Sequence, residues 1–433
     1  MKTRVQVVFP AVAPDEPTWP YIGYDVEARS REVTASLERQ LPELEFVPFV
    51  YRSETQAAAA LQGERFDGYL VYMTSMWTGI PELYAREARP VVIADEPYSG
   101  SGGFLRVHSM VRQEGLPVVT VGSSNFLDIV NAVRLFDVMR RMREARTLVV
   151  ADGDVWGARQ DVREECKKVF GTEVIQIGSD KLRQYYDAAD DQEAERWKDR
   201  WIGEAAFVAE PDEKEILRSA RLYLALKAAM QEAQADAVTV DCLGLFYAGK
   251  LPAYPCLGFF QLNNEGSTGV CEADVDSMIT QLVLRYVTGR PGYVSDPVLD
   301  TTTGQITYAH CVATNRVFGP GGLTNPYIIR SHAEDHKGAA VQSLMPIGHQ
   351  VTSAKVSLRH KSLAVHNART VANVNDEKGC RTKLAAEARV QKLLDNYHFE
   401  IFSWHRVTCY GDFRQELINL ATLYGLKVYE EDR

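Results

Sequence analysis

The first part of the chain alternates short, continuous apolar runs with longer amphipathic segments. The apolar runs predict strands at 5–9, 46–50, 68–72, 90–94 and 117–121. Between the first two of them, a helix is predicted at about 25–41. Continuous apolar runs separated by helices are typical of a parallel sheet that is covered on both faces. A long helix at about 126–144 then leads to a new strand at 147–151, where we place a domain boundary.

The same pattern restarts after this boundary and then changes near residue 290. The restart predicts helices near 158–169 and 212–233, and strands at 237–240 and around 258–260. Beyond it, strand-like segments lie at 306–309, 350–356, 363–365, 400–404 and 426–429, with helices only at about 380–395 and 412–424. These patterns predict an α/β protein with two tandem doubly wound domains, 1–145 and 146–290, and a β-rich, barrel-like C-terminal domain, 291–433.

Composition narrows the classes of function. The net charge of the 433 residues is −10, which disfavours a nucleic-acid partner because phosphate binding needs an excess of Lys and Arg. The sequence has neither an apolar stretch of the ~18 residues that span a bilayer nor a recognisable export signal. The seven cysteines are scattered without a C-x-x-C pair, which favours a reducing compartment. We therefore expect a cytoplasmic protein without a membrane partner.

The segment V-C-E-A-D-V-D brings three carboxylates to the start of an apolar helix. Ser267 or Thr268 is the expected N-cap, which places Glu272, Asp274 and Asp276 in the first two turns. Acids at this position can simply complement the helix dipole. Glu272 borders the apolar stripe and is expected to point into a domain seam. Asp274 and Asp276 are expected to be solvated.

Three further side chains could form a metal site together with Glu272. Asp296 lies in G-Y-V-S-D-P, His310 ends the predicted strand in T-Y-A-H-C, and His405 lies in F-S-W-H-R-V-T-C. Two carboxylates and one or two imidazoles at element ends suit one divalent cation. The mixed donors favour Mn²⁺ or a similar ion over Ca²⁺, which prefers oxygens, or structural Zn²⁺, which usually has cysteines. Spacing alone does not establish the site, because no local motif such as H-E-x-x-H is present.

Other residues near element ends are candidate contacts to a ligand. Gln261, Asn263 and Asn264 follow the strand predicted around 258–260, and strand ends in α/β sheets bind ligands. A polar turn is the alternative interpretation of these three amides. Trp404 could form an apolar wall of a site, or it could be a core aromatic residue.

Several motifs resemble those of a known enzyme family. The segments E-A-D-V-D-S-M-I-T, T-G-R-P-G-Y-V-S-D-P and Y-A-H-C resemble the L-fucose/L-arabinose isomerase superfamily. The later segments R-S-H-A-E-D-H-K-G, G-C-R-T-K-L-A-A-E-A and W-H-R-V-T-C-Y-G-D-F look like its fucose-isomerase-like members. The N-terminal part agrees with the family only in the predicted order of its elements.

The resemblance implies a metal-dependent aldose–ketose isomerase that acts on an open-chain pentose or hexose through an enediolate. Glu272 and Asp296 would be the acid and base and would bind the metal together with His405. His310 resembles a further metal-site histidine of the arabinose isomerases, and His332 and Glu334 would have a structural or sugar-contacting role. The family also implies a homo-trimer or homo-hexamer, in which N-terminal residues reach a neighbour's site.

Two other functions are compatible with the same sequence. Tandem α/β domains also occur in sugar-binding proteins without catalysis, which close around their ligand. An epimerase or aldolase could use the same metal site, because an enediolate can react in several ways. The sugar is left open, because the second acid is Asp, as in the fucose isomerases, whereas His310 follows the arabinose pattern.

Overall fold

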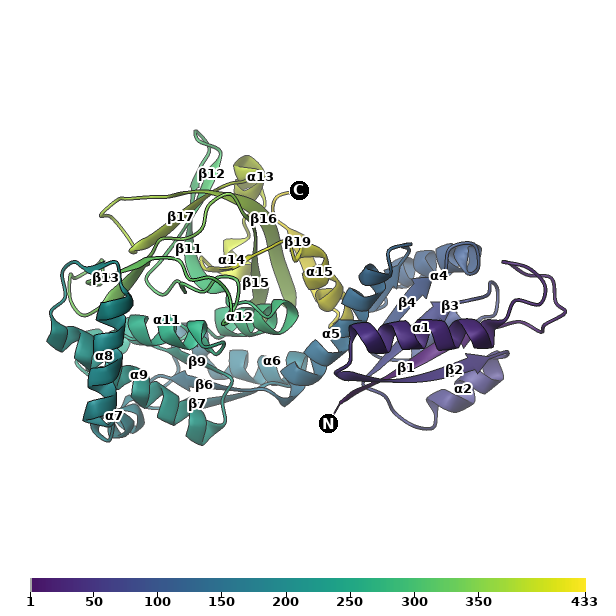
Figure 1. The fold of residues 1–433 in the computed structure, drawn as a ribbon, viewed down its shortest axis with the longest axis horizontal. Coiled ribbons are helices and arrows are strands. Elements are labelled where there is room, and N and C mark those ends of the chain that lie inside the picture. The colour runs from purple at the N-terminus through teal and green to yellow at the C-terminus, as the bar shows by residue number, and fades with distance from the viewer. Residues whose placement is uncertain (1) are drawn as a thin grey trace. The chain divides into compact units, whose positions relative to one another are not determined.

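The computed structural model describes residues 2–433, which form two compact units (Figure 1). Unit 1 extends to Arg141 and also contains Gln415–Lys427, whereas unit 2 contains Met142–Arg414 and Val428–Arg433. The chain therefore passes between the units after residues 141, 414 and 427. Within residues 2–433, none of the helices is long and apolar enough to cross a bilayer.

Unit 1 is built on a five-stranded parallel sheet with the strand order β2-β1-β3-β4-β5. Its strands are β1 (Thr3–Pro10), β2 (Leu44–Tyr51), β3 (Gly68–Met73), β4 (Val91–Asp95) and β5 (Val118–Val121). They alternate with α1 (Val26–Gln40), α2 (Glu54–Leu61), α3 (Ile80–Glu87), α4 (Ser101–Glu114) and α5 (Phe126–Glu144). The strands and helices predicted for this part are confirmed. The inner strands are buried apolar runs of the kind that parallel sheets require, whereas β2 at the sheet edge is partly exposed.

The α/β part of unit 2 contains a four-stranded parallel sheet with the order β10-β9-β6-β7. Its strands are β6 (Arg146–Val150), β7 (Glu173–Ile177), β9 (Ala237–Val240) and β10 (Thr268–Val270). The helices are α6 (Gln160–Phe170), α7 (Ser179–Asp187), α8 (Asp191–Glu204), α9 (Glu213–Ala233), α10 (Cys242–Tyr247), α11 (Cys256–Asn264) and α12 (Val275–Thr288), with a 3-10 turn η1 (Trp156–Ala158). Helices α6, α9, α11 and α12 pack against this sheet.

The C-terminal part of unit 2 contains a closed antiparallel barrel, so the predicted barrel-like region is confirmed. The ring runs β15-β18-β11-β12-β17-β16 and closes because β16 also pairs with β15. The strands are β11 (Tyr293–Asp300), β12 (Gln305–His310), β15 (Gln350–Ser357), β16 (Ser362–Asn373), β17 (Thr382–Glu387) and β18 (Arg406–Tyr410), and β19 (Lys427–Glu430) is added beside β16. Helix α12 lies beside β15 and β18 and thus connects the parallel sheet to the barrel (Figure 1).

A small third sheet and short helices complete the fold. The sheet has the order β14-β13-β8, and its strands are β8 (Phe207–Val208), β13 (Tyr327–Arg330) and β14 (Ala340–Ser343). The remaining helices are α13 (Val390–Asp395), α14 (Phe399–Phe402) and α15 (Arg414–Leu423).

Three local predictions are wrong. The strand expected around 258–260 is part of α11, whose nine residues are all buried, and a short apolar run does not distinguish a buried helix from a buried strand. The first half of the helix expected at 380–395 is β17, because pairing with β12 and β16 overrides the helix propensity of K-L-A-A-E. The strand expected at 400–404 begins instead as α14.

Candidate metal centre

Glu272 lies in the tight turn that connects β10 to α12. Both Glu272 and Ala273 adopt left-handed backbone conformations, with φ of +67° and +49°. Residues other than glycine rarely do so, and each such conformation costs about 1–3 kcal/mol. The turn is held by Ala273 N, which donates to Val240 O at 2.9 Å. The surrounding structure holds this strained turn in place and thereby fixes the direction of the Glu272 side chain.

The barrel brings Asp296, His310 and His405 next to one another. Asp296 on β11 pairs with Ala309 on β12, so His310 at the end of β12 is its near neighbour. On the other side of β11, Ser295 pairs with Arg406, so His405 is placed directly before β18 and beside Asp296. The register of three barrel strands therefore brings together side chains that are far apart in the sequence.

Donor atoms of these residues and of Glu272 converge at one point. His405 Nε2 lies 3.2 Å from Asp296 Oδ1 and 3.5 Å from Glu272 Oε2, and His310 Nε2 lies 3.9 Å from Glu272 Oε1. One donor atom each of Glu272, His310 and His405 lies within 4.8 Å of the others, and no other group of three His, Cys, Asp or Glu residues within 2–433 does so. The four residues of the predicted metal site are thus brought together.

Two of the converging atoms are buried without a hydrogen-bond partner within residues 2–433, namely Asp296 Oδ1 and His310 Nε2. A buried polar atom without a partner costs about 1–3 kcal/mol, so it indicates a missing group. His310 Nδ1 accepts a hydrogen bond from Cys311 N at 2.9 Å, which places the ring proton on Nε2. In this orientation His310 offers an N–H group. Glu272, Asp296 and His405 offer the lone pairs that fit a divalent cation.

The charges at the centre shift the pKa values of its members in different directions. Burial lowers the pKa of His310 to about 4, so this ring is neutral. Burial also opposes the charged form of His405, but the hydrogen bond to Asp274 and the neighbouring carboxylates of Asp296 and Glu272 raise its pKa to about 10. Without a cation, His405 is therefore an imidazolium, and a metal ion bound to Nε2 would replace its proton.

The pKa values of the two carboxylates move apart. Burial raises the pKa of Glu272, and the charge of Asp296 adds to this effect while His405 opposes it. Burial also acts on Asp296, but the charged His405 ring 3.2 Å away holds its pKa below the usual range. Asp296 is thus held as a carboxylate, whereas Glu272 takes up a proton more readily.

The prediction that Asp274 and Asp276 are solvated is wrong. Asp274 is only 6% exposed and is itself the N-cap of α12, since it accepts from Ser277 N at 2.9 Å. Asp276 is half-buried, and its carboxylate accepts from Leu358 N at 3.2 Å. Both acids face the barrel because α12 packs against β15 and β18. The expected N-cap at Ser267 or Thr268 is also wrong, since Thr268 begins β10.

A cavity of about 610 Å³ opens in front of Glu272, Asp296 and His310. Its wall also contains three of the residues expected to contact a ligand, His332, Glu334 and Trp404. Trp404 is half-exposed, and its indole N–H donates to Pro297 O at 3.1 Å, which fixes the ring. The cavity can therefore hold a small ligand beside the converging donor atoms.

Sequence reasoning missed part of the cavity wall. Tyr254 lines it and stacks on His332 with ring centroids 4.2 Å apart. Five cysteines, which the spacing gave no reason to group, line it as well: Cys242, Cys256, Cys271, Cys311 and Cys380. Most of these cysteines follow strands or begin helices near the turn at Glu272, a relation that is visible only in the fold.

The structure places Gln261, Asn263 and Asn264 on α11, away from the cavity lining. All three are buried and bonded to protein groups. Asn263 bonds both Gly269 N and Gly269 O, at 3.0 and 3.1 Å. Gln261 accepts from the Trp201 indole N–H at 3.1 Å, and the Asn264 side-chain oxygen accepts from Asn315 N at 3.1 Å. These amides connect elements of unit 2.

No protein-family model matches the sequence, and no curated protein is significantly similar to it. A solved structure described as "XylFII-LytSN complex" contains a chain that is 10% identical, over 58% of this chain and 85% of that chain, with a TM-score of 0.17. A second, described as "XylFII molecule", is 11% identical over 58% of this chain and 86% of that chain, with a TM-score of 0.15. Both scores are too low to indicate a shared fold.

Proposed function

We propose that the protein is a metal-dependent aldose–ketose isomerase of the fucose-isomerase-like type. The observation that carries this proposal is the convergence of Glu272, Asp296 and His405, of which the two carboxylates line one cavity. Two carboxylates and an imidazole suit Mn²⁺ or a similar cation, and the orphaned Asp296 oxygen supports a missing positive group. A binding protein without catalysis would have no use for this set of residues.

The reaction moves a hydrogen between the first two carbons of an open-chain pentose or hexose. A bound cation supplies Lewis-acid polarisation of the carbonyl and stabilises the negative charge of the enediolate. Glu272 accepts the proton from one carbon, since its raised pKa allows it to hold and return a proton. Asp296 remains ionised, contributes to the cation site and assists at the neighbouring carbon. The N–H group of His310 is placed to donate to a substrate oxygen.

The rest of the cavity would orient the sugar. Trp404 presents a half-exposed aromatic surface, and the His332 ring and the Glu334 carboxylate offer polar groups on the same wall. Sugars are bound by this combination of an apolar face and hydrogen-bonding groups. We therefore assign sugar contacts to these three residues rather than to the amides on α11.

The proposal extends to architecture and assembly. We propose that the two parallel sheets belong to tandem doubly wound domains of a cytoplasmic homo-trimer or homo-hexamer. Trp77 and Tyr98 support an assembly, because they follow β3 and β4, are 61% and 77% exposed, and have positive φ values. Strained, exposed aromatic residues of this kind fit a contact with another copy. Light scattering at micromolar concentration tests the oligomer, and a monomer would contradict it.

The proposed reaction is tested by a screen of aldoses and ketoses with Mn²⁺, followed by NMR in D₂O. An isomerase gives a new sugar with deuterium at C1 or C2, and activity is lost after dialysis against EDTA. A binding protein gives neither product nor exchange. An aldolase gives smaller fragments, and an epimerase gives a stereoisomer of the same sugar class. Only the first result supports the proposal.

A further inference from the structure

The imidazole of His405 is held by a carboxylate that lies outside the cavity. Its Nδ1 donates to Asp274 Oδ2 at 2.8 Å, while its Nε2 faces Asp296 and Glu272. Asp274 does not line the cavity of about 610 Å³. The two ring nitrogens of His405 therefore face different groups. Nε2 faces the carboxylates of the candidate metal centre, and Nδ1 bonds Asp274 behind it.

Asp274 is fixed from several directions at once. Its Oδ1 accepts from Ser277 N at 2.9 Å, which makes it the N-cap of α12. Its Oδ2 accepts from the Ser277 hydroxyl at 2.7 Å and from Lys355 Nζ at 2.5 Å, in addition to His405 Nδ1. With this many donors, the carboxylate has one stable position, and the position sets that of the His405 ring.

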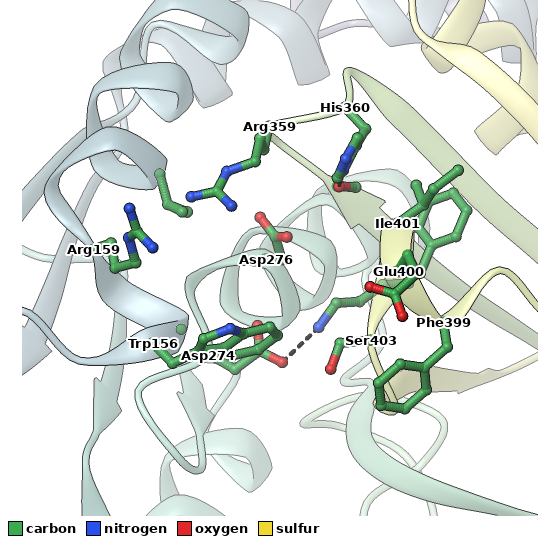
Figure 2. Close-up of a pocket in the computed structure, with 15 residues that line it drawn as sticks. Trp156, Arg159, Asp274, Asp276, Arg359, His360, Phe399, Glu400, Ile401 and Ser403 are labelled. Atoms are coloured by element: carbon green, nitrogen blue, oxygen red, sulfur yellow. Dashed lines mark hydrogen bonds and ion pairs between the residues drawn. The ribbon is translucent and has the colours of Figure 1, made fainter.

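Lys355 comes from the barrel strand β15 and supplies the opposite charge. Its side chain is only 2% exposed, and its Nζ bonds both Asp274 and Ser277. A buried ammonium group needs a paired and hydrogen-bonded anion. Figure 2 shows this ion pair as a dashed line that ends on Asp274, at the wall of a separate cavity of about 110 Å³. The barrel and the first turn of α12 are thus tied together behind His405.

We propose that Asp274, held by Lys355, is a positioning residue that fixes the His405 ring so that the Nε2 lone pair is presented to the cation. This inference rests on the metal centre of the proposed function and not on the isomerase reaction. A histidine ligand whose second nitrogen donates to a carboxylate keeps one tautomer and one orientation. Loss of such a partner typically reduces metal affinity by about 10–100-fold.

The inference is tested by Mn²⁺ binding to the full chain, measured from the electron paramagnetic resonance signal of free Mn²⁺. Asp274→Asn keeps the N-cap, since Asn caps helices as well as Asp. It replaces the oxygen that accepts three donors with an NH₂ group or leaves that oxygen misplaced. We expect Asp274→Asn to weaken Mn²⁺ binding by about 10–100-fold.

Asp276→Asn is the matched control. It makes the same substitution two residues further along, but Asp276 accepts from Leu358 N and does not contact His405. Figure 2 shows Asp276 in the same cavity wall as Asp274. We expect Mn²⁺ binding of this variant to match that of the wild type. Equal weakening by both variants, or no weakening by Asp274→Asn, would overturn the inference.

A measurement on the wild-type chain tests the inference even if the Asp274→Asn variant does not fold. With Zn²⁺ as a diamagnetic probe, ¹⁵N NMR of labelled histidines should show one ring with a protonated Nδ1 and a metal-bound Nε2, and this signal should be absent in His405→Asn. The opposite assignment of the two nitrogens would overturn the inference. If His405→Asn binds Mn²⁺ as tightly as the wild type, the metal centre itself fails. If Mn²⁺ binding follows the expected pattern but no sugar reacts, only the isomerase proposal fails.

Discussion

The two carboxylates beside His405 carry opposite pKa shifts, which separates their tasks. Glu272→Gln keeps the size of the side chain but removes the proton acceptor. We expect turnover to fall by about 10²–10⁴-fold, the usual cost of lost general acid–base catalysis. The turnover of Asp296→Asn should fall at least as far, because this substitution also removes a carboxylate oxygen from the cation site. Steady-state kinetics on the sugar found in the screen measure both effects.

Asp276→Asn is again the control for these kinetics, since Asp276 lies on the same helix but away from the cavity. Its turnover should be close to that of the wild type. If Glu272→Gln retained wild-type turnover with Mn²⁺ bound, Glu272 would have no catalytic task. If the control lost as much as Glu272→Gln, the effect would come from the helix.

Asp276 should make stability depend on pH. Burial raises its pKa to about 7, compared with 3.8 for an ordinary Asp. The folded state therefore binds more protons than the unfolded state between these values, and the stabilising effect of the proton is lost as the pH rises through about 7. Asp276→Asn removes this loss. We expect the variant to be more stable than the wild type at pH 8, by on the order of 1–3 kcal/mol, because Asp276 is only half-buried.

Urea denaturation at pH 5 and pH 8 measures this difference. The advantage of Asp276→Asn should be clearly smaller at pH 5 than at pH 8, because at pH 5 the wild-type chain has lost only part of the stabilisation that disappears between pH 3.8 and about pH 7. An advantage of the same size at both values would show that Asp276 does not titrate in this range.

At the residue scale, the sequence was informative about Glu272, Asp296 and His405, because recognisable motifs surround each of them. It gave the wrong environment for Asp274. The motif E-A-D-V-D reads as a solvated helix start, and only the packing of α12 against β15 brings Lys355 to Asp274. Lys355 is far from Asp274 in the sequence, and no local sequence pattern predicts a contact between residues so far apart.

At the scale of elements, Asn263 joins α11 to β10 and α12. It bonds both backbone groups of Gly269, and Gln281 Nε2 donates to its oxygen at 2.8 Å. Asn263→Ala would leave Gly269 N without a partner, while Gln281 Nε2 and Gly269 O would keep only their mutual contact at 3.5 Å, so we expect a loss of about 2–4 kcal/mol of stability. Chemical denaturation measures the loss. The KM for sugar should not change. A changed KM at unchanged stability would show that Asn263 contacts the substrate.

Secondary-structure elements could be predicted where the sequence pattern fits only one type of element. The strands β1 to β5 are apolar runs between amphipathic helices, and this alternation has a single simple interpretation. Helix α11 and strand β17 were not predictable in the same way. The first is buried on all sides, so no exposed polar face reveals a helical period, and the second consists of residues that prefer helices but are held by two neighbouring strands. Packing against α9 and β10 surrounds α11, and pairing with β12 and β16 fixes β17.

At the scale of the whole molecule, every residue of the candidate metal centre belongs to unit 2. Saturating Mn²⁺ should therefore stabilise unit 2 by mass action, by about 2.7 kcal/mol at 100 times the dissociation constant. Hydrogen exchange detected by mass spectrometry should show slower exchange in β10, β11, β12 and β18. Exchange in the sheet of unit 1 should be unaffected, and EDTA should reverse the change. Equal protection of both sheets, or none, would contradict a metal site at this place.

Unit 1 receives Gln415–Lys427 only after the chain has passed through nearly all of unit 2. This segment carries buried apolar residues, among them Leu417, Leu420 and Ala421. On a ribosome that adds about 5–20 residues per second, the interval between Arg141 and Gln415 lasts roughly 15–50 s. During that time the nascent sheet of unit 1 is complete, but the surface meant for α15 is open to water. A chaperone that recognises exposed apolar surface should therefore hold the nascent chain until residue 427 has left the exit tunnel.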